Sequence, residues 1–326
     1  MVQSSRQVRS IKTIKRPIEK ELKTFEQRFR EDMRSHVPLL DKITYYIVQR
    51  KGKQVRPMFV FLCAKICGEI HDASYHAASL VELLHTATLV HDDVVDDSNE
   101  SQGFFSLNAI WKNKIAVLVG DYLLQKGFLI ALKNKRFELL EIVAEAVKEM
   151  SEGKLLFISR VRKFDFDEKN YLEIVRKKTA SLISAACSAG ATSTTEDTEV
   201  IRKMKFFGEK IGIAFQIRDE LFDFVSNGTS KPLGIDLKEK GISLPLVFAL
   251  NQASDSEQRK MINHINNDEK LKEVVAFVKA SGGIEYAQKV MQKYRQEASE
   301  ILQSLPASDA RKSLEDLVDY VIERKR

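Results

Sequence analysis

Residues 76–97 read HAASLVELLHTATLVHDDVVDD, and this stretch decides the fold class. Apolar side chains cover most of a helical circumference before the aspartates begin. That pattern is typical of a helix buried at the centre of a helical domain. Strand-type alternation of apolar and polar residues is nowhere sustained. The sequence therefore predicts an all-α fold.

The flanking sequence extends this prediction to most of the chain. No proline occurs between Pro57 and Pro232, which favours long helices. We predict one large helical domain over residues 21–326, preceded by a basic N-terminal arm, residues 1–20. The arm is either a solvated extension or a membrane-surface segment. Further helices are expected at 110–133, 137–150, 168–190, 197–225 and 284–304.

The composition indicates which binding partners and which cellular compartment to expect. The net charge of +6 is modest and dispersed, so no nucleic-acid partner is expected. We expect no membrane-spanning segment, although the basic arm leaves peripheral membrane contact open. Cys63 and Cys67 lie one helical turn apart, but no second ligand pair accompanies them. We interpret them, with Cys187, as reduced core residues and expect a cytoplasmic protein.

The aspartates that end residues 76–97 need a positive partner. Asp92 and Asp96 are four residues apart and share a helix face, and Asp93 and Asp97 form an adjacent pair. The C-terminal end of a helix carries partial negative charge, so carboxylates there are unfavourable without a cation. A solvated acidic helix end is the plainer alternative, but it fits poorly after so apolar a helix.

A second acidic cluster lies in GIAFQIRDELFDF, residues 212–224. Asp219 and Asp223 are again four residues apart on an apolar helix, with Glu220 and Gln216 beside them. Carboxylate oxygens with room for water suit Mg²⁺, which commonly binds substrate phosphates as well. Two such helices facing each other would offer ligands from both sides of a cavity.

Basic residues flank both clusters. Each alone is an ordinary surface cation, but together they are typical of diphosphate-binding clamps. These residues are Lys51, Lys53, Arg56, Lys177, Lys178, Lys231 and Lys240.

The stretches ELLHTATLVHDDVVDDS, GDYLL, RKKTASLI, FQIRDELFDF and KPLGIDLKEKGISLPL, in that order, resemble the trans-polyprenyl diphosphate synthase family. The resemblance implies an all-α fold with a deep central cavity, and a homodimer or a heteromer. It also implies condensation of an allylic diphosphate with isopentenyl diphosphate. Ala87 and Thr88 are small residues before the first motif, which is similar to the long-chain members.

The resemblance also implies roles for individual residues. It makes Asp92, Asp93, Lys178 and Asp219 catalytic. The implied Mg²⁺ ligands are Asp92, Asp93, Asp96, Asp219 and Asp223, with Glu220 where the family has an aspartate. The implied substrate-binding residues are Lys53, Arg56, His85, Lys178, Gln216 and Lys231.

The sequence departs from the family where isopentenyl diphosphate would bind. Two arginines usually follow the first motif, whereas this chain has Ser101 and Gln102. A glutamate and a glutamine of the family are replaced by Lys154 and Phe157. Three interpretations follow: an elongating prenyltransferase, a class I terpene synthase-like enzyme that needs no isopentenyl diphosphate, or a non-catalytic subunit of a heteromeric synthase.

Overall fold

The computed structural model describes residues 10–49, 54–95, 100–101, 104–163, 167–225, 242–265, 267 and 270–323. Most of these residues are helical, which confirms the all-α prediction. The described strands are β1 (Glu100–Ser101) and β2 (Phe104–Phe105), which pair antiparallel.

The chain divides into two compact units. Unit 1 takes its described residues from Met1–Val147, Ala185–Lys205 and Leu305–Leu317. Unit 2 takes them from Lys148–Ser184, Phe206–Ser304 and Val318–Arg326. The single domain with its boundary at residue 20 and the deep central cavity stay predictions.

The helices are distributed as follows. Unit 1 contains α1 (Ile11–Lys15), a 3-10 turn (Arg16–Ile18), α2 (Glu19–Asp32), α3 (Pro38–Gln49), α4 (Val55–Cys67), α5 (Asp72–Val95) and α6 (Leu107–Lys133). Unit 2 contains α8 (Glu168–Val175), a π-helix (Arg176–Ala180), α12 (Leu244–Gln252), α13 (Asp255–Ile265), α14 (Leu271–Ala280) and α15 (Gly283–Gln303). Both units take residues from α7 (Phe137–Lys163), α9 (Ser181–Thr192), α10 (Thr198–Val225) and α16 (Asp309–Glu323).

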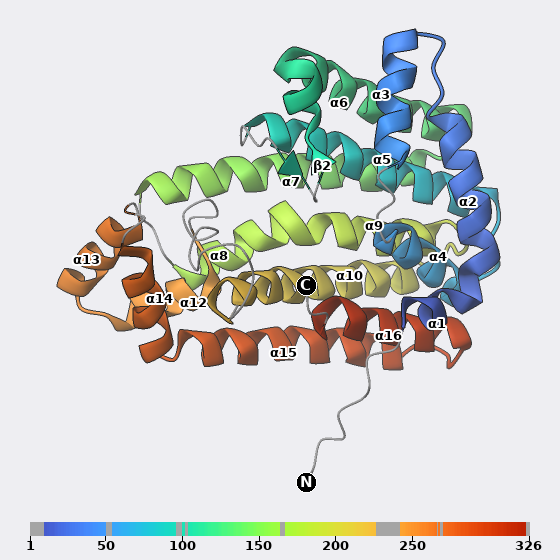
Figure 1. Cartoon of the computed structure of the whole chain (residues 1–326). Helices are drawn as coiled ribbons and strands as arrows, with labels where there is room; N and C mark the ends of the chain where they lie inside the picture. The colour runs from blue at the N-terminus through green and yellow to red at the C-terminus, as the bar shows by residue number, and fades with distance from the viewer. Residues whose placement is uncertain are drawn as a thin grey trace. The chain divides into compact units, whose positions relative to one another are not determined.

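The core of unit 1 is built on α5, the helix predicted from residues 76–97. α5 and α6 pack side by side (Figure 1). The side chains buried between them are Leu83, Ala87, Val90, Ala116, Val119 and Leu123. Burial of apolar surface stabilises such a contact by about 25 cal/mol per Å². The packing fixes the helix that ends in the first aspartate motif.

Unit 2 has its own apolar core near the end of α10. Phe224 of α10 packs with Leu246 and Leu250 of α12 and with Val274 and Val278 of α14. All of these side chains are fully or almost fully buried. They anchor the helix that carries the second aspartate motif.

The described part of the N-terminal arm is packed into unit 1. Ile14 and Ile18 are 0% exposed, and Ser10 caps α1 by accepting a hydrogen bond from the backbone N–H of Thr13. Ile14 and Ile18 therefore anchor the described part of the arm to unit 1, and the role of the arm stays a prediction. Residues 1–9 lie outside the described residues.

By length and composition alone, the 109–133 segment of α6 could cross a membrane, with a mean hydropathy of 1.7 over its most apolar window. No such segment was expected from the sequence. A third of that window is buried inside the protein, whereas the core helix of a soluble protein is mostly buried. The absence of a membrane span stays a prediction.

The three cysteines are free thiols, as predicted. Cys63 and Cys187 are buried, and Cys67 is half-buried. Burial raises the pKa of Cys63 well above its usual value and that of Cys67 to about 12. Neutral thiols of this kind behave as small apolar side chains.

Candidate active site

The predicted site residues divide between the two units. Unit 1 carries Arg56, His85, Asp92 and Asp93, and unit 2 carries Lys178, Gln216 and Asp219. Lys53, Asp96 and Lys231 lie outside the described residues, and Asp223 is described only as part of helix α10. The meeting of the two aspartate motifs therefore stays a prediction.

In unit 1, the first motif lies in the last turn of α5. Asp92 is half-buried, whereas Asp93 is 7% exposed. Burying a carboxylate is costly, and the C-terminal end of the helix adds partial negative charge. Hard carboxylate oxygens in this setting suit a divalent cation. Among the residues that the structure describes, which exclude Asp96, no group of three or more His, Cys, Asp or Glu side chains could hold a metal ion.

The residue before this motif connects α5 to α6. His91 Nε2 lies 3.2 Å from the carbonyl oxygen of Val117 and 3.4 Å from Asp121 Oδ1. A Cβ atom on Gly120 would lie 2.2 Å from His91 Nε2, so glycine leaves the space that the imidazole fills. The GDYLL stretch thus positions the end of α5. The GDYLL stretch stands out in the sequence, but no local pattern shows that His91 is its partner.

Two of the predicted substrate-binding residues, Arg56 and His85, lie near each other in unit 1. Burial lowers the pKa of His85 well below its usual value, and the charge of nearby Arg56 lowers it further. The imidazole is therefore neutral near pH 7 and can donate one hydrogen bond. Burial also lowers the pKa of Arg56, against the attraction of Glu82.

Glu82 is a member of this group that sequence reasoning missed. Burial raises its pKa, whereas Arg56 lowers it. Its Oε2 atom is buried and has no hydrogen-bond partner among the described residues. The sequence does contain a feature that could have identified Glu82, because it is the one acidic residue within the apolar run HAASLVELLH.

In unit 2, a cavity of about 180 Å³ is lined by Lys178, Gln216 and Asp219. These residues place a cation, an amide and a carboxylate around one space. The other lining residues are Phe157, Tyr171, Ile174, Val175, Thr179, Glu220 and Ile242. Such a mixture of apolar walls with a few polar groups is typical of small-molecule sites.

Lys178 reaches this cavity from a π-helix. Its Nζ atom lies 4.5 Å from the centroid of the Phe157 ring, at cation–π distance. Thr179 Oγ1 donates a hydrogen bond of 3.0 Å to Gln216 Oε1, which orients the amide. Single π-turns are rare and frequently lie at functional sites.

The π-helix is held tightly against α7. Arg176 pairs with Glu149 at 2.9 Å, and Lys177 pairs with Glu152 at 2.6 Å. A Cβ atom on Gly153 would lie 2.7 Å from the backbone nitrogen of Lys178. Only glycine allows the two backbones to approach this closely.

We expect Gly153→Ala to destabilise the protein, although alanine favours a helix interior by about 1 kcal/mol. The added Cβ atom would clash with the backbone of Lys178, which cannot rotate away as a side chain can. Such overpacking costs about 1–3 kcal/mol. Denaturant unfolding measures the difference. Leu155→Ala, at a position 68% exposed on the same helix, is the control and should be near neutral. A Gly153→Ala protein more stable than the parent would contradict this account.

Lys154 adds a second ammonium group near Lys178. Burial lowers its pKa to about 8, and the charge of Lys178 contributes to the shift. With a pKa of about 8, Lys154 is still mostly cationic near pH 7. At this position the resembled family has glutamate, so the local charge in this chain is reversed.

Glu220 is buried at 3% exposure and connects three helices of unit 2. Its Oε2 atom accepts hydrogen bonds from Tyr171 Oη at 2.8 Å and from the backbone N–H of Leu244 at 2.9 Å. Its Oε1 atom accepts from Gln216 Nε2 at 3.1 Å. Burial and the carboxylate raise the pKa of Tyr171 well above its usual value. Glu220 therefore supports the cavity wall, a role that the motif alone did not reveal.

Comparison with known proteins assigns the chain to a family. The family model for polyprenyl synthetase matches residues 37–280, which is most of the chain. The chain belongs to the polyprenyl synthetase family.

Relatives of this polyprenyl synthetase support the assignment over nearly its full length. It is 33% identical over 303 residues to the octaprenyl diphosphate synthase of Escherichia coli (strain K12), covering 91% of this chain and 93% of that protein. It is 31% identical over 308 residues to heptaprenyl diphosphate synthase component 2 of Bacillus subtilis (strain 168), covering 94% of this chain and 88% of that protein.

Solved structures agree with this result. A polyprenyl synthase from Caulobacter crescentus CB15, complexed with calcium and isoprenyl diphosphate, has a TM-score of 0.88 at 29% identity, covering 98% of this chain and all of that one. A geranylgeranyl pyrophosphate synthase from Bacteroides thetaiotaomicron has a TM-score of 0.82 at 35% identity, covering 96% and 99%. The predicted membership and fold of the polyprenyl synthetase are thus confirmed, while the roles of individual residues stay predictions.

Proposed function

We propose that this polyprenyl synthetase condenses an allylic prenyl diphosphate with isopentenyl diphosphate to form a longer trans-polyprenyl diphosphate. The observation that carries the proposal is the cavity of unit 2, where Lys178, Gln216 and Asp219 line one space. The family match over residues 37–280 supports the same reaction.

The proposed role of each residue follows from the chemistry of its side chain. Asp92, Asp93 and Asp219 offer hard oxygen ligands, for which Mg²⁺ is the metal that we propose, with Asp96 and Asp223 completing the set. When bound, Mg²⁺ neutralises the charge of the departing diphosphate. Lys178 and Lys231 bind and orient that diphosphate, and Gln216 shapes the site.

The second substrate is assigned to the unit 1 group. Arg56 and His85, together with Lys53, are proposed to hold isopentenyl diphosphate. In unit 2, apolar side chains such as Ile174 and Val175 line the cavity and exclude water from a reactive carbocation.

The chain length of the product is proposed to be long, as in the octaprenyl and heptaprenyl relatives. Ala87 packs in the α5–α6 core, which leaves Thr88 as the candidate for the small residue beside the growing chain. Thr88 is half-buried, and its hydroxyl donates a 2.9 Å hydrogen bond to the carbonyl oxygen of His85.

The proposal is tested by incubating the protein with Mg²⁺, farnesyl or geranylgeranyl diphosphate and labelled isopentenyl diphosphate. Labelled, longer prenyl diphosphates support it. Label-free hydrocarbon or alcohol would instead support the terpene synthase-like alternative. The loss of both arginines at Ser101 and Gln102 is what favours that second candidate.

Restoring the arginines is expected to improve use of isopentenyl diphosphate. Each charge-assisted hydrogen bond to a diphosphate contributes about 1.5–3 kcal/mol. The Ser101→Arg/Gln102→Arg variant should therefore lower the KM for isopentenyl diphosphate by at least about tenfold. The KM for the allylic substrate, measured in the same assay, is the control and should stay constant. An unchanged KM for isopentenyl diphosphate would show that other residues hold this substrate.

We propose a homodimer that uses the exposed apolar residues of α6. Val117, Leu118, Leu129 and Leu132 are 40–67% exposed and lie toward one side of the helix. Because the Bacillus subtilis relative is named component 2, a heteromer is the alternative. Sedimentation of the purified chain distinguishes a homodimer from a chain that needs a different subunit. We also propose a cytoplasmic location.

A further inference from the structure

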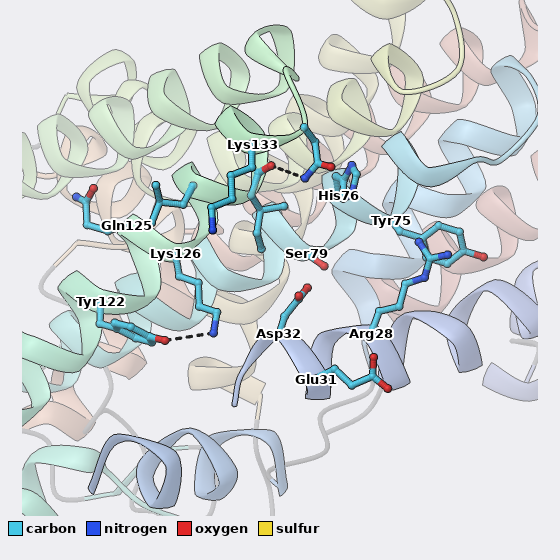
Figure 2. Close-up of a pocket in the computed structure, with 13 residues that line it drawn as sticks. Arg28, Glu31, Asp32, Tyr75, His76, Ser79, Tyr122, Gln125, Lys126 and Lys133 are labelled. Carbon is cyan, nitrogen blue, oxygen red and sulfur yellow. Dashed lines mark hydrogen bonds between the residues drawn. The ribbon is translucent and has the colours of Figure 1, made fainter. Parts of the chain in front are cut away.

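Unit 1 contains a cavity of about 540 Å³ between α2, α5 and α6 (Figure 2). On α5 it is lined by Tyr75, His76 and Ser79. At 3.6 residues per turn, Ser79 lies about 140° around the helix from Asp92. The cavity therefore opens on a different side of α5 from the first aspartate motif.

The walls of this cavity carry opposite charges. Asp32 and Glu31 come from the last turn of α2, and Lys126 and Lys133 come from α6. Arg28 of α2 also lines the cavity, but it pairs with Asp72 at 2.8 Å. Figure 2 shows Asp32 on the α2 side and the two lysines on the α6 side. Burial raises the pKa of Asp32 even though Lys126 attracts its charge. A ligand cation beside this half-buried carboxylate would therefore stabilise its charged form, as the nearby basic groups do.

Lys126 of the basic wall is held in position by two hydrogen bonds. Lys126 Nζ donates to the carbonyl oxygen of Arg34 at 3.3 Å and to Tyr122 Oη at 3.2 Å. An ammonium group has three N–H donors, so one remains for a ligand. Lys133 is exposed at the end of α6.

Two polar groups of α5 complete the cavity. Ser79 is 3% exposed and lines the cavity with its hydroxyl-bearing side chain. His76 Nδ1 is buried and has no hydrogen-bond partner among the described residues. Buried polar groups are normally satisfied, by protein, water or a ligand.

We propose that this cavity binds a small dipolar molecule with a phosphate or carboxylate at one end and an ammonium group at the other. The anionic end lies against Lys126 and Lys133, and the ammonium group lies against Asp32 and Glu31. Ser79 and His76 supply hydrogen bonds between the two ends. The volume falls within the 300–1,000 Å³ range of small-molecule sites.

Calorimetric titration of the full chain with phosphoethanolamine tests this proposal. Ethanolamine and ethyl phosphate are matched probes, because each keeps a two-carbon body and one of the charged ends. We expect phosphoethanolamine to bind at least about tenfold more tightly than either. Equal affinity for phosphoethanolamine and ethyl phosphate would overturn the proposal, because no acidic wall would then be involved.

Variants locate the binding. Asp32→Asn should remove the preference for phosphoethanolamine over ethyl phosphate. Lys133→Met, at an exposed position that folding tolerates, should weaken the binding of phosphoethanolamine at least several-fold. Lys20→Met on α2 and Asp219→Asn in unit 2 are controls and should bind like the parent. The proposal fails if Lys133→Met binds like the parent, or if Asp219→Asn abolishes binding, which would place the ligand at the predicted catalytic residues.

Discussion

Asp219→Asn is expected to lower kcat/KM by about 10³-fold, which corresponds to about 4 kcal/mol of transition-state stabilisation. Asp219 lines the unit 2 cavity with Lys178 and offers the carboxylate that we assign to Mg²⁺. Asparagine keeps the size of the side chain but removes the charge that holds the cation. Ionisation of the allylic diphosphate should therefore be the step that suffers.

Steady-state kinetics with saturating Mg²⁺ measure this loss. Glu199→Gln, an exposed carboxylate at the start of the same helix, is the control and should leave kcat/KM unchanged. An Asp219→Asn protein with more than a tenth of the parental activity would remove Asp219 from the proposed metal set.

A double-variant cycle extends this test to the first motif. Asp92→Asn is expected to cost about as much as Asp219→Asn. If both carboxylates act on one diphosphate, the double variant should lose far less than the product of the two single losses, because groups that act as a unit are strongly non-additive. Multiplicative losses would mean that the two motifs act independently.

The sequence predicted the features that depend on periodicity and composition. The apolar circumference of residues 76–97 predicted α5, which is observed at Asp72–Val95 with Leu83, Ala87 and Val90 in its core. The amphipathic pattern of residues 197–225 predicted α10, which is observed at Thr198–Val225 and carries both Asp219 and Asp223. The helix predicted at 137–150 continues to Lys163. Gly153 lowers the helix propensity at that point, but it lets α7 pack closely against the backbone of Lys178.

Other features were not predictable because they depend on contacts between distant residues. Residues 168–190 look like one continuous helix, but the structure contains a π-turn at Arg176–Ala180 that changes the register of Lys178. A period of 3.6 residues cannot show one extra residue in a turn. Likewise, the link from Glu220 to Tyr171 spans 49 residues, and no local pattern encodes it.

Glu220→Ala is expected to lower the free energy of unfolding by about 3–5 kcal/mol. The substitution leaves three donors without their acceptor: the buried Tyr171 Oη and backbone N–H of Leu244, and the half-buried Gln216 Nε2. A hydrogen bond to a charged group contributes about 1.5–3 kcal/mol, and water entering the space recovers part of the loss. Equilibrium denaturation by urea measures the change.

Two milder variants separate this structural role from metal binding. Tyr171→Phe removes one donor and should cost about 1 kcal/mol. Glu220→Gln keeps an acceptor for Tyr171 but removes the charge that strengthens these bonds, and the Gln216 amide must rotate so that its N–H₂ donates to Thr179 Oγ1 instead. We expect this variant to lose stability while kcat/KM falls less than about tenfold. A 10³-fold loss of activity with unchanged stability would show that Glu220, like the aspartate that it replaces, is a metal ligand.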